Sequence, residues 1–205
     1  MIKKIAMKGR IFFTSALVAA ASLLGAVDAF ANVPKPTSEV VIDVDGQKLD
    51  LLKSGQQVAS FRISTSKFGL GDDLHSYKTP LGTFEVCSKL GDELPMGAVI
   101  KRGHFTGEVL PPNAPGRDPI VTRVIRLQGL EPQNRHALGR GIYIHGTPEE
   151  RRIGKPVSWG CIRMRSKDVV ELFKQVQVGT RVIIRSKAQH GSQPGDWLSF
   201  TNWFS

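Results

Sequence analysis

Short strand-like segments, rather than helices, dominate the part of this chain that can form a folded core. Residues 40–44, 47–52 and 58–64 are apolar or alternating runs, joined by the turn signals at 45–46 (Asp-Gly) and 53–55 (Lys-Ser-Gly). An Asp-Gly pair between two such runs is typical of a tight β-hairpin. The sequence therefore predicts an antiparallel meander at the start of the folded region. Four later segments have the same strand-like character: residues 82–86, 120–127, 141–145 and 181–184.

One segment has the periodicity of a helix instead. Residues 169–176 place apolar side chains at helical spacing, with Ser166 as a candidate N-cap and Asp168 in the first turn. Gly179 follows the end of this pattern. One amphipathic helix among many short strands predicts a mostly β fold, a sandwich or barrel with the helix packed on it.

The two ends of the chain differ from this region. Residues 1–31 combine positive charges, an apolar stretch and the small-x-small sequence at 29–31, the pattern of a secretory signal peptide. An uncleaved membrane anchor is the alternative. Residues 32–38 contain two prolines and are predicted as a linker, and residues 187–205 as an aromatic C-terminal tail that docks on its own domain. We therefore expect one domain at 39–186 and export to the periplasm or cell wall.

A Gly- and Pro-rich segment at 90–119 separates two of the predicted strands. It carries Lys101, Arg102, His104 and Arg117. A loop of this length inside a compact domain is usually functional or disordered. We interpret it as a lid over the site, with a mobile surface insertion as the alternative.

The formal net charge is +10, from 28 Lys and Arg against 18 Asp and Glu. A basic exported protein is suited to weak association with an anionic membrane or wall surface, although solvated basic faces without a specific partner are an equally open interpretation. The sequence contains no Lys/Arg-rich block and no nucleic-acid motif, which argues against nucleic acid as a partner. No histidines stand at metal-ligand spacing beside an acidic or cysteine cluster, so we expect no metal and no cofactor.

Cys161 is the residue that points most directly to chemistry. It follows Gly160, and His145 ends an apolar run upstream. A cysteine nucleophile requires a thiol and an imidazole that takes or stabilises its proton. Glycine lets the backbone approach a substrate carbonyl, so the N–H groups of Gly160 and Cys161 are candidate oxyanion donors. The competing structural interpretation is a disulfide between Cys161 and Cys87, although a small buried role in a strand suits Cys87 better.

The neighbours of these residues suggest further roles. Tyr143 and His145 are two apart on a predicted strand and share a face. An imidazolium beside Cys161 would favour the thiolate. A backbone carbonyl at Gly146 could hold the ring tautomer of the histidine. Arg163 is suited to a substrate carboxylate.

Three motifs resemble those of the L,D-transpeptidases, the YkuD-like catalytic domain. His145-Gly146, followed by Ser-Trp-Gly-Cys-Ile-Arg-Met at 158–164, resembles the signature around the family's cysteine. Thr-Pro-Leu-Gly-Thr-Phe at 79–84 is a second element, and the polar turn at 64–69 is a weaker third. The resemblance covers about 39–185, in the right order.

The resemblance implies a β-sandwich-like domain with one main helix following the catalytic cysteine. In that family Cys161 would attack a peptidoglycan stem peptide at the bond between an L-centre and the following D-residue. His145 would be general base and acid, the Gly146 carbonyl its orienter, and the N–H groups of Gly160 and Cys161 the oxyanion donors. Arg163 would help to hold the substrate. The acyl-enzyme would pass to an amine of a second stem or a lysine of another protein, and carbapenems would react with the same cysteine.

Trp159 departs from the family pattern, which usually has histidine at this position. The indole could narrow the side of the site where the acceptor amine enters, or it could stack on the substrate. Packing of Trp159 in the core is an equally open alternative. The residues predicted to bind substrate are Tyr143, Ser158, Trp159 and Arg163.

Three functions remain open from the sequence. They are an exported L,D-transpeptidase, an L,D-carboxypeptidase that cuts the same bond with water, and a non-catalytic peptidoglycan-binding domain. The presence of both His145 and Cys161 favours an enzyme.

Overall fold

The computed structural model describes residues 38–187. The predicted signal segment at 1–31, the linker up to residue 37 and the tail from residue 188 lie outside the described residues.

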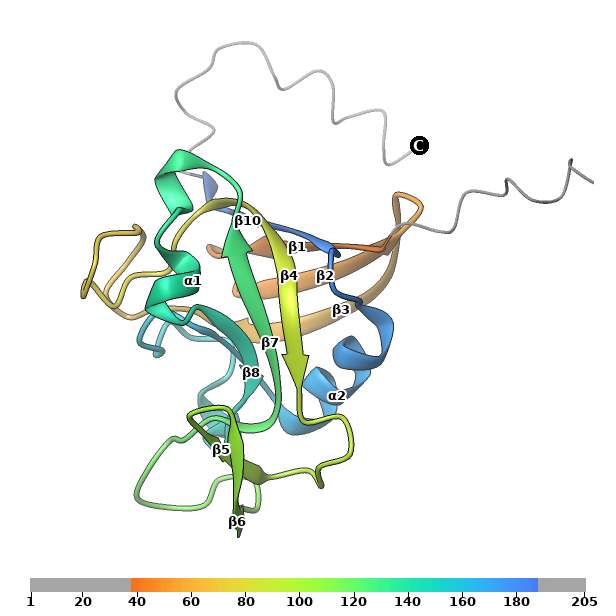
Figure 1. Ribbon diagram of the computed structural model, residues 1–205, viewed down its shortest axis with the longest axis vertical. Helices are drawn as coiled ribbons and strands as arrows, with labels where there is room; N and C mark the ends of the chain where they lie inside the picture. The colour runs from red at the N-terminus through yellow and green to blue at the C-terminus, as the bar shows by residue number, and fades with distance from the viewer. Residues whose placement is uncertain (1–37, 188–205) are drawn as a thin grey trace, which may run out of the picture. The chain divides into compact units, whose positions relative to one another are not determined.

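Strands make up most of the regular structure in this part of the chain (Figure 1). The strands are β1 (Ser38–Asp43), β2 (Lys48–Lys53), β3 (Gln56–Ser64), β4 (Gly82–Leu90), β5 (Ala98–Lys101), β6 (His104–Val109), β7 (Val121–Gly129), β8 (Tyr143–Gly146), β9 (Ile162–Met164) and β10 (Arg181–Arg185). The helices are α1 (Ala137–Arg140) and α2 (Ser166–Gln175), with 3-10 turns at Pro132–Asn134 and Glu150–Arg152. The prediction of a mostly β domain with one main helix after the cysteine is confirmed.

The strands form one strongly curved sheet in the order β4-β10-β1-β2-β3-β9-β8-β7-β5-β6. β4 pairs with β7 as well as with β10, so the sheet closes on itself from β4 round to β7. Most pairs are antiparallel, and the pairs β1–β10 and β8–β9 are parallel. β5 and β6 extend the sheet beyond this closed part.

The predicted meander is formed by β1, β2 and β3, which pair antiparallel in sequence. The first turn is stabilised by Asp43, whose Oδ1 accepts the N–H groups of Asp45 and Gly46 at 3.0 and 3.1 Å. Gln47 takes a left-handed φ of 48° there, and Ser54 and Gly55 do so in the second turn. The second turn thus has the left-handed pair of a two-residue hairpin, whereas in the first turn the left-handed residue is Gln47 and not the Asp-Gly pair.

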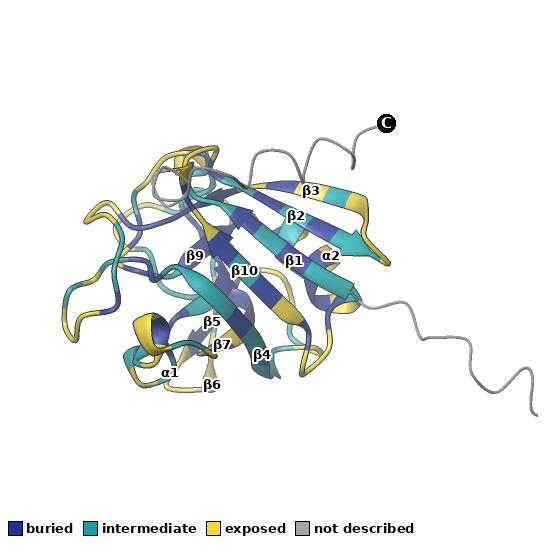
Figure 2. Cartoon of the chain, turned by 90° about the horizontal axis from the view of Figure 1, so that it is seen from above, coloured by how far each residue is buried: buried dark blue, intermediate teal, exposed yellow. Residues whose placement is uncertain are grey.

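The hydrophobic core lies inside the closed sheet and under α2. Alternate residues of β1 and β2 point inward, and Figure 2 shows the resulting alternation of buried and partly buried positions along β1 and β10. From α2, Val169, Leu172 and Phe173 join the same cluster. Each fully buried side chain of this size contributes about 1.5–3 kcal/mol. The core therefore fixes the strands around the site.

The start of α2 differs from the prediction. Ser166 is the first helical residue, and the N-cap is Arg165, whose side chain makes no capping hydrogen bond. The N–H of Ser166 instead donates to Oε1 of Glu150 at 2.8 Å, and its hydroxyl accepts from Thr122 at 2.8 Å. A carboxylate from a distant turn thus replaces the local cap, and it also suits the positive end of the helix.

The prediction of a long loop at 90–119 was wrong in part. Residues within it form the antiparallel hairpin β5–β6, which turns at Arg102 and Gly103 and adds to the sheet through the pair Val99 and Val121. Nearly every residue of β6 is exposed, so the sequence lacks the alternation that marks a half-buried strand. Figure 1 shows the hairpin projecting from the end of the sheet.

None of the helices between residues 38 and 187 is both long and apolar enough to cross a membrane.

Truncation of Leu172 tests the account of the core. Leu172 is fully buried between α2 and the sheet, so Leu172→Ala should lower the free energy of unfolding by about 2–5 kcal/mol. Val178 is 65% exposed, so Val178→Ala should change it by less than about 0.5 kcal/mol. Urea denaturation followed by circular dichroism measures both. Equal effects of the two substitutions would contradict the packing described.

Candidate active site

The parallel pair β8–β9 brings the predicted catalytic residues together. Its register aligns Ile144 with Ile162 and His145 with Arg163. Side chains of aligned residues in neighbouring strands project from the same face, and every second residue of a strand shares that face. Tyr143, two residues before His145, therefore lies on the same face as His145 and Arg163, and the charge of Arg163 acts on both His145 and Cys161. Cys161 immediately precedes β9, so the sulfur lies at the start of this strand.

His145 is buried and its ring is oriented by the backbone. Nδ1 lies 2.8 Å from the carbonyl oxygen of Gly146. A carbonyl only accepts, so Nδ1 carries the proton and Nε2 keeps its lone pair. Burial lowers the pKa of His145 to about 4, opposed by the Gly146 contact and reinforced by the positive charge of Arg163. The imidazole is therefore neutral at pH 7 and can act as a base.

Gly146 has little space for a side chain. A Cβ built on this residue would lie 2.6 Å from the carbonyl oxygen of Val121 and 3.1 Å from Cβ of Thr122. β7 bulges at this point, where Thr122 takes a φ of 71°. Glycine thus lets β8 approach the bulge closely, and this approach fixes the carbonyl that holds His145.

Cys161 is held as a thiol. Its Sγ donates to the carbonyl oxygen of Gly141 at 3.3 Å. Burial raises the pKa of the thiol above its ordinary value, against the opposing effects of the Tyr143 N–H and the charges of Arg163 and Arg140. Desolvation thus favours the neutral forms of both His145 and Cys161 in the free protein, so help to the thiolate from an imidazolium stays a prediction. A neutral pair requires proton transfer during attack, as in general-base catalysis.

The turn before Cys161 is organised by Ser158. The Ser158 hydroxyl donates to the Cys161 carbonyl at 2.6 Å and accepts the N–H of Gly160 at 3.2 Å. Ser158 is fully buried, so the structure gives it a role in holding the turn and does not support the predicted contact with substrate. Because the Gly160 N–H is already bonded, its predicted role as an oxyanion donor is not supported either. The Cys161 N–H stays a prediction.

Gly160 is required for its backbone conformation. Its φ is 118°, and a Cβ there would lie 3.2 Å from the carbonyl oxygen of Lys78 and 3.3 Å from Cδ1 of Ile142. Glycine at this position allows the turn that presents Cys161.

Arg163 has carboxylate partners within the chain. It is buried, forms an ion pair with Asp118, and lies 3.5 Å from Glu149. The prediction that Arg163 binds a substrate carboxylate is therefore not supported, because both carboxylates come from its own domain. Its charge still acts on His145 and Cys161, as the pKa shifts of both groups reflect. Asp118 and Glu149 are far from Arg163 in sequence, which is why sequence reasoning missed them.

Tyr143 contributes to the site through its backbone N–H, which favours the thiolate form of Cys161. Its ring is partly buried and lies 5.6 Å from the guanidinium of Arg126. A contact between the ring and a substrate stays a prediction.

Trp159 does not pack in the core. Its side chain is 54% exposed and contacts Phe68 and Tyr77. The core-packing interpretation is therefore wrong, and an exposed indole lies two residues from the nucleophile.

The segment 66–79 forms a wall beside this turn. Thr79 Oγ1 donates to the Gly160 carbonyl and accepts the N–H of Ser66, both at 3.0 Å. Arg140 donates to the Lys78 carbonyl at 2.6 Å and pairs with the buried Asp72 at 2.9 Å. The Thr-Pro motif of the sequence thus has a structural role, since its threonine ties the wall to the cysteine turn.

The two cysteines do not form a disulfide. Both are free, and Cys87 donates to the Arg126 carbonyl at 3.5 Å. Cys87 lies at a bulge of β4 and is partly exposed, so the expected buried role is wrong. The Cys161 thiol is thus available.

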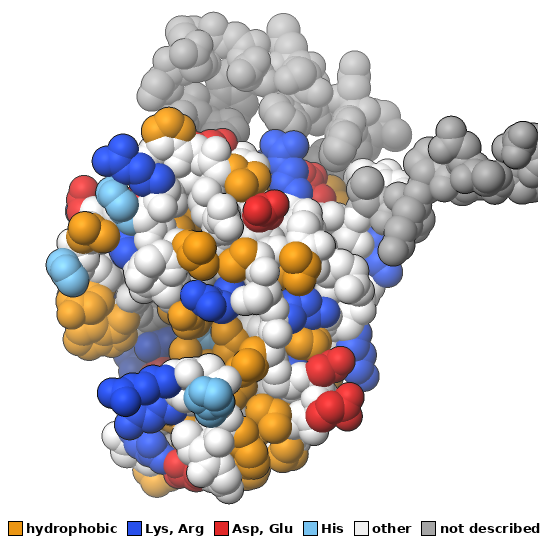
Figure 3. Space-filling model, in the orientation of Figure 1, with side chains coloured by type: hydrophobic (Ala, Val, Ile, Leu, Met, Phe, Trp, Pro, Cys, Tyr) orange, Lys and Arg blue, Asp and Glu red, His pale blue; other side chains and the backbone are white. Residues whose placement is uncertain are grey.

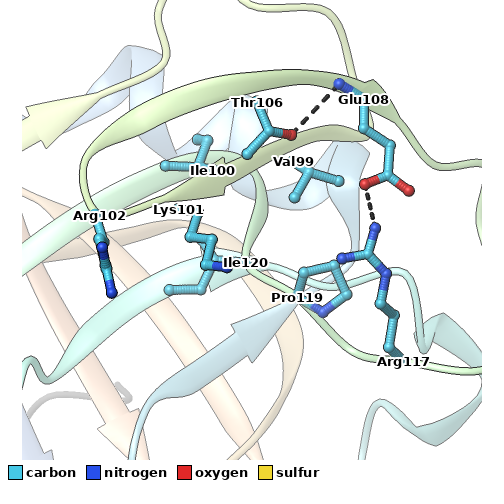
Figure 4. A pocket seen from close by; sticks show the side chains of 9 residues that line it. All are labelled: Val99, Ile100, Lys101, Arg102, Thr106, Glu108, Arg117, Pro119 and Ile120. Carbon is cyan, nitrogen blue, oxygen red and sulfur yellow. Dashed lines mark hydrogen bonds and ion pairs between the residues drawn. The ribbon is translucent and has the colours of Figure 1, made fainter.

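A pocket of about 530 Å³ lies between the β5–β6 hairpin and the chain that enters β7 (Figure 4). Figure 4 shows the ion pair of Glu108 with Arg117 at its edge. The residues that line it are Val99, Ile100, Lys101, Arg102, Thr106, Glu108, Arg117, Pro119 and Ile120. None of the predicted site residues lines this pocket. Between residues 38 and 187, no group of three or more His, Cys, Asp or Glu side chains could hold a metal ion.

A family model for the L,D-transpeptidase catalytic domain, YkuD, matches residues 37–184. The chain belongs to this family. Among curated proteins, ErfK/SrfK of Escherichia coli, named as a probable L,D-transpeptidase, is 45% identical over 64 residues, which cover 30% of this chain and 21% of that protein. YqjB of Bacillus subtilis, whose name gives the same family, is 56% identical over 46 residues, covering 22% and 26%. The chain spans about a quarter of the length of these relatives.

Solved structures of the same family are more distant in sequence. An L,D-transpeptidase from Mycobacterium smegmatis is 19% identical with a TM-score of 0.48, covering 73% of this chain and 59% of that one. An L,D-transpeptidase from Xylanimonas cellulosilytica is 20% identical with a TM-score of 0.48, covering 75% and 63%.

The protonation state of the pair can be measured directly. Because burial holds the pKa of Cys161 above its ordinary value, ultraviolet absorbance should show no Cys161 thiolate at pH 7. The neutral imidazole is present above the His145 pKa of about 4. The rate of Cys161 acylation should therefore decrease only as the pH is lowered to values well below 6.5. Cys161→Ser retains Cys87, so its titration gives the absorbance of Cys87 alone, which is subtracted from that of the unsubstituted protein. A thiolate signal at neutral pH that is absent from Cys161→Ser would contradict the neutral pair.

Proposed function

We propose that this protein is an exported L,D-transpeptidase that acylates Cys161 with a peptidoglycan stem peptide and transfers the acyl group to an amine. One observation carries the proposal: the β8–β9 register aligns His145, whose imidazole is oriented by the Gly146 carbonyl, with Arg163, two residues after the Cys161 thiol, and the charge of Arg163 acts on both groups. Membership of the L,D-transpeptidase family supports the reaction class. Residues 1–31 support export, as a prediction from sequence.

In the first step the thiol attacks the carbonyl carbon of the L-centre that precedes the terminal D-alanine. Nε2 of His145 takes the thiol proton as the C–S bond forms. The negative charge on the carbonyl oxygen is stabilised by the positive field of Arg163 and Arg140, with the Cys161 N–H as the predicted hydrogen-bond donor. The C–N bond then breaks, the imidazolium gives its proton to the leaving amine, and D-alanine departs.

In the second step an amine attacks the thioester. His145 takes a proton from the attacking nitrogen, the C–S bond breaks, and the proton returns to sulfur. The acceptor is the amine of a second stem, which gives a cross-link, or a lysine of another protein. With water as acceptor, the same steps release a tripeptide, which is carboxypeptidase activity.

A purely wall-binding domain fits the geometry less well. An imidazole buried deeply enough to lower its pKa to about 4 costs free energy of solvation, and the partly exposed Cys161 thiol has no disulfide partner. Groups with such perturbed pKa values are typical of functional sites. A binding surface gains nothing from them, whereas general-base catalysis uses both.

Turnover of a tetrapeptide stem tests the proposal. Cys161→Ala should abolish release of D-alanine, because no other group can form the acyl bond. Cys87→Ala is the matched control and should retain activity, since Cys87 lies at a bulge of β4 and takes no part in the proposed mechanism.

Mass spectrometry of the products then separates the two enzyme classes. Cross-linked dimers indicate transpeptidation, and tripeptides alone indicate that water is the acceptor. Full activity in Cys161→Ala would overturn the proposed nucleophile.

A further inference from the structure

Three exposed aromatic side chains beside the nucleophile have no part in the mechanism above. Trp159 is 54% exposed, Tyr77 50% and Phe68 41%. The Trp159 ring lies 5.1 Å from Phe68 and 5.2 Å from Tyr77 between centroids, and Phe68 lies 5.9 Å from Tyr77. We call these three side chains the aromatic platform. A contiguous exposed apolar patch on a small domain usually marks a binding surface.

A lysine of the same chain already occupies part of this platform. Lys67 Nζ lies 4.6 Å from the centroid of the Trp159 ring and 5.0 Å from that of Phe68. Aromatic rings that bind a ligand cation keep their faces free for it. Here the cation is internal, so a second cation, such as an acceptor lysine, would be repelled. Neutral or anionic ligands with apolar faces fit the platform better.

The platform is held in place by hydrogen bonds of the wall segment 66–79. Ser66 Oγ donates to the Tyr77 carbonyl at 2.5 Å and accepts the N–H of Phe68 at 2.9 Å. The N–H of Lys67 donates to the Ser158 carbonyl at 3.1 Å. Tyr77 takes a left-handed φ of 55°, which costs free energy for a non-glycine residue. Aromatic rings fixed in an exposed position lose little entropy on binding.

Figure 3 shows hydrophobic side chains gathered at the left edge of the molecule, over the loop that follows β3. Basic side chains lie below them, over β5 and β6.

We propose that the aromatic platform binds a pyranose ring of the glycan strand that carries the donor stem. This inference rests on the proposed function. The C–H groups on the face of a pyranose carry small positive charges and pack on the negative face of an aromatic ring. The hydroxyl groups at the rim of the sugar accept hydrogen bonds from a cation such as Lys67.

The dimensions agree with this assignment. The acyl group on Cys161 is a tripeptide whose far end joins the glycan, and three extended residues span about 10 Å. Trp159 is two residues from Cys161, and its Cα can lie at most about 7 Å from that of Cys161. The indole and its two neighbours extend further from there, so the platform lies at a distance from Cys161 that a stem of this length can span.

Two substrates that differ only in the sugar test the inference. The first is the free tetrapeptide stem, and the second is the same tetrapeptide on its disaccharide. Release of D-alanine without an added acceptor measures the donor step alone. Trp159→Ala should lower kcat/KM for the disaccharide substrate about tenfold and leave that for the free tetrapeptide within about twofold. Trp159→Phe keeps an aromatic ring for stacking, so it should retain most of the preference for the disaccharide substrate over the free tetrapeptide.

The control is Leu130→Ala, which removes an apolar side chain of similar exposure, 52%, outside the site. It should not change the ratio between the substrates. If Trp159→Ala left the ratio of kcat/KM between the two substrates unchanged, with or without an equal loss on both, the inference about the platform would be overturned and the proposed function would stand. Absence of turnover of either substrate by the unsubstituted protein would instead overturn the proposed function, and this inference with it.

Discussion

The parallel pairing of β8 with β9 is the constraint on which the site depends. Both strands are short, yet their register aligns His145 with Arg163, whose charge acts on the imidazole and on the Cys161 thiol. A slip of one residue would send one set of side chains to the opposite face of the sheet. The closed sheet and its core prevent such a slip, because β8 is also paired with β7 and β9 with β3. Gly146 adds to this, since only a glycine lets β8 lie against the bulge of β7.

Burial then sets the electrostatics of the pair. Desolvation lowers the pKa of His145 and raises that of Cys161, so both groups are neutral in the resting protein. Arg163 supplies positive charge beside them, and its own burial is compensated by Asp118 and Glu149. A buried charge without such partners would be costly. The uncharged forms of Cys161 and His145 are therefore favoured in the resting protein, and the proposed reaction requires proton transfer as the thiol attacks.

Sequence reasoning succeeded where the signal was local. The meander of β1 to β3 follows from alternating residues and an Asp-Gly turn, and the helix α2 follows from its apolar stripe. It failed where partners come from distant segments. Glu150 caps α2 in place of Ser166, and the exposed hairpin β5–β6 has no alternation to reveal it. The side chain of Trp159 could not be placed from sequence, because its exposure depends on the wall segment 66–79, which folds back on the cysteine turn.

Reaction with a carbapenem tests the central claim most directly, namely that Cys161 is a reactive thiol activated by His145. Intact-protein mass spectrometry should show one covalent adduct on the unsubstituted protein, and peptide mapping should place it on Cys161. The same adduct should form on Cys87→Ala, form far more slowly on His145→Ala, and be absent from Cys161→Ala. No adduct on the unsubstituted protein, or an adduct that maps to Cys87, would contradict the account.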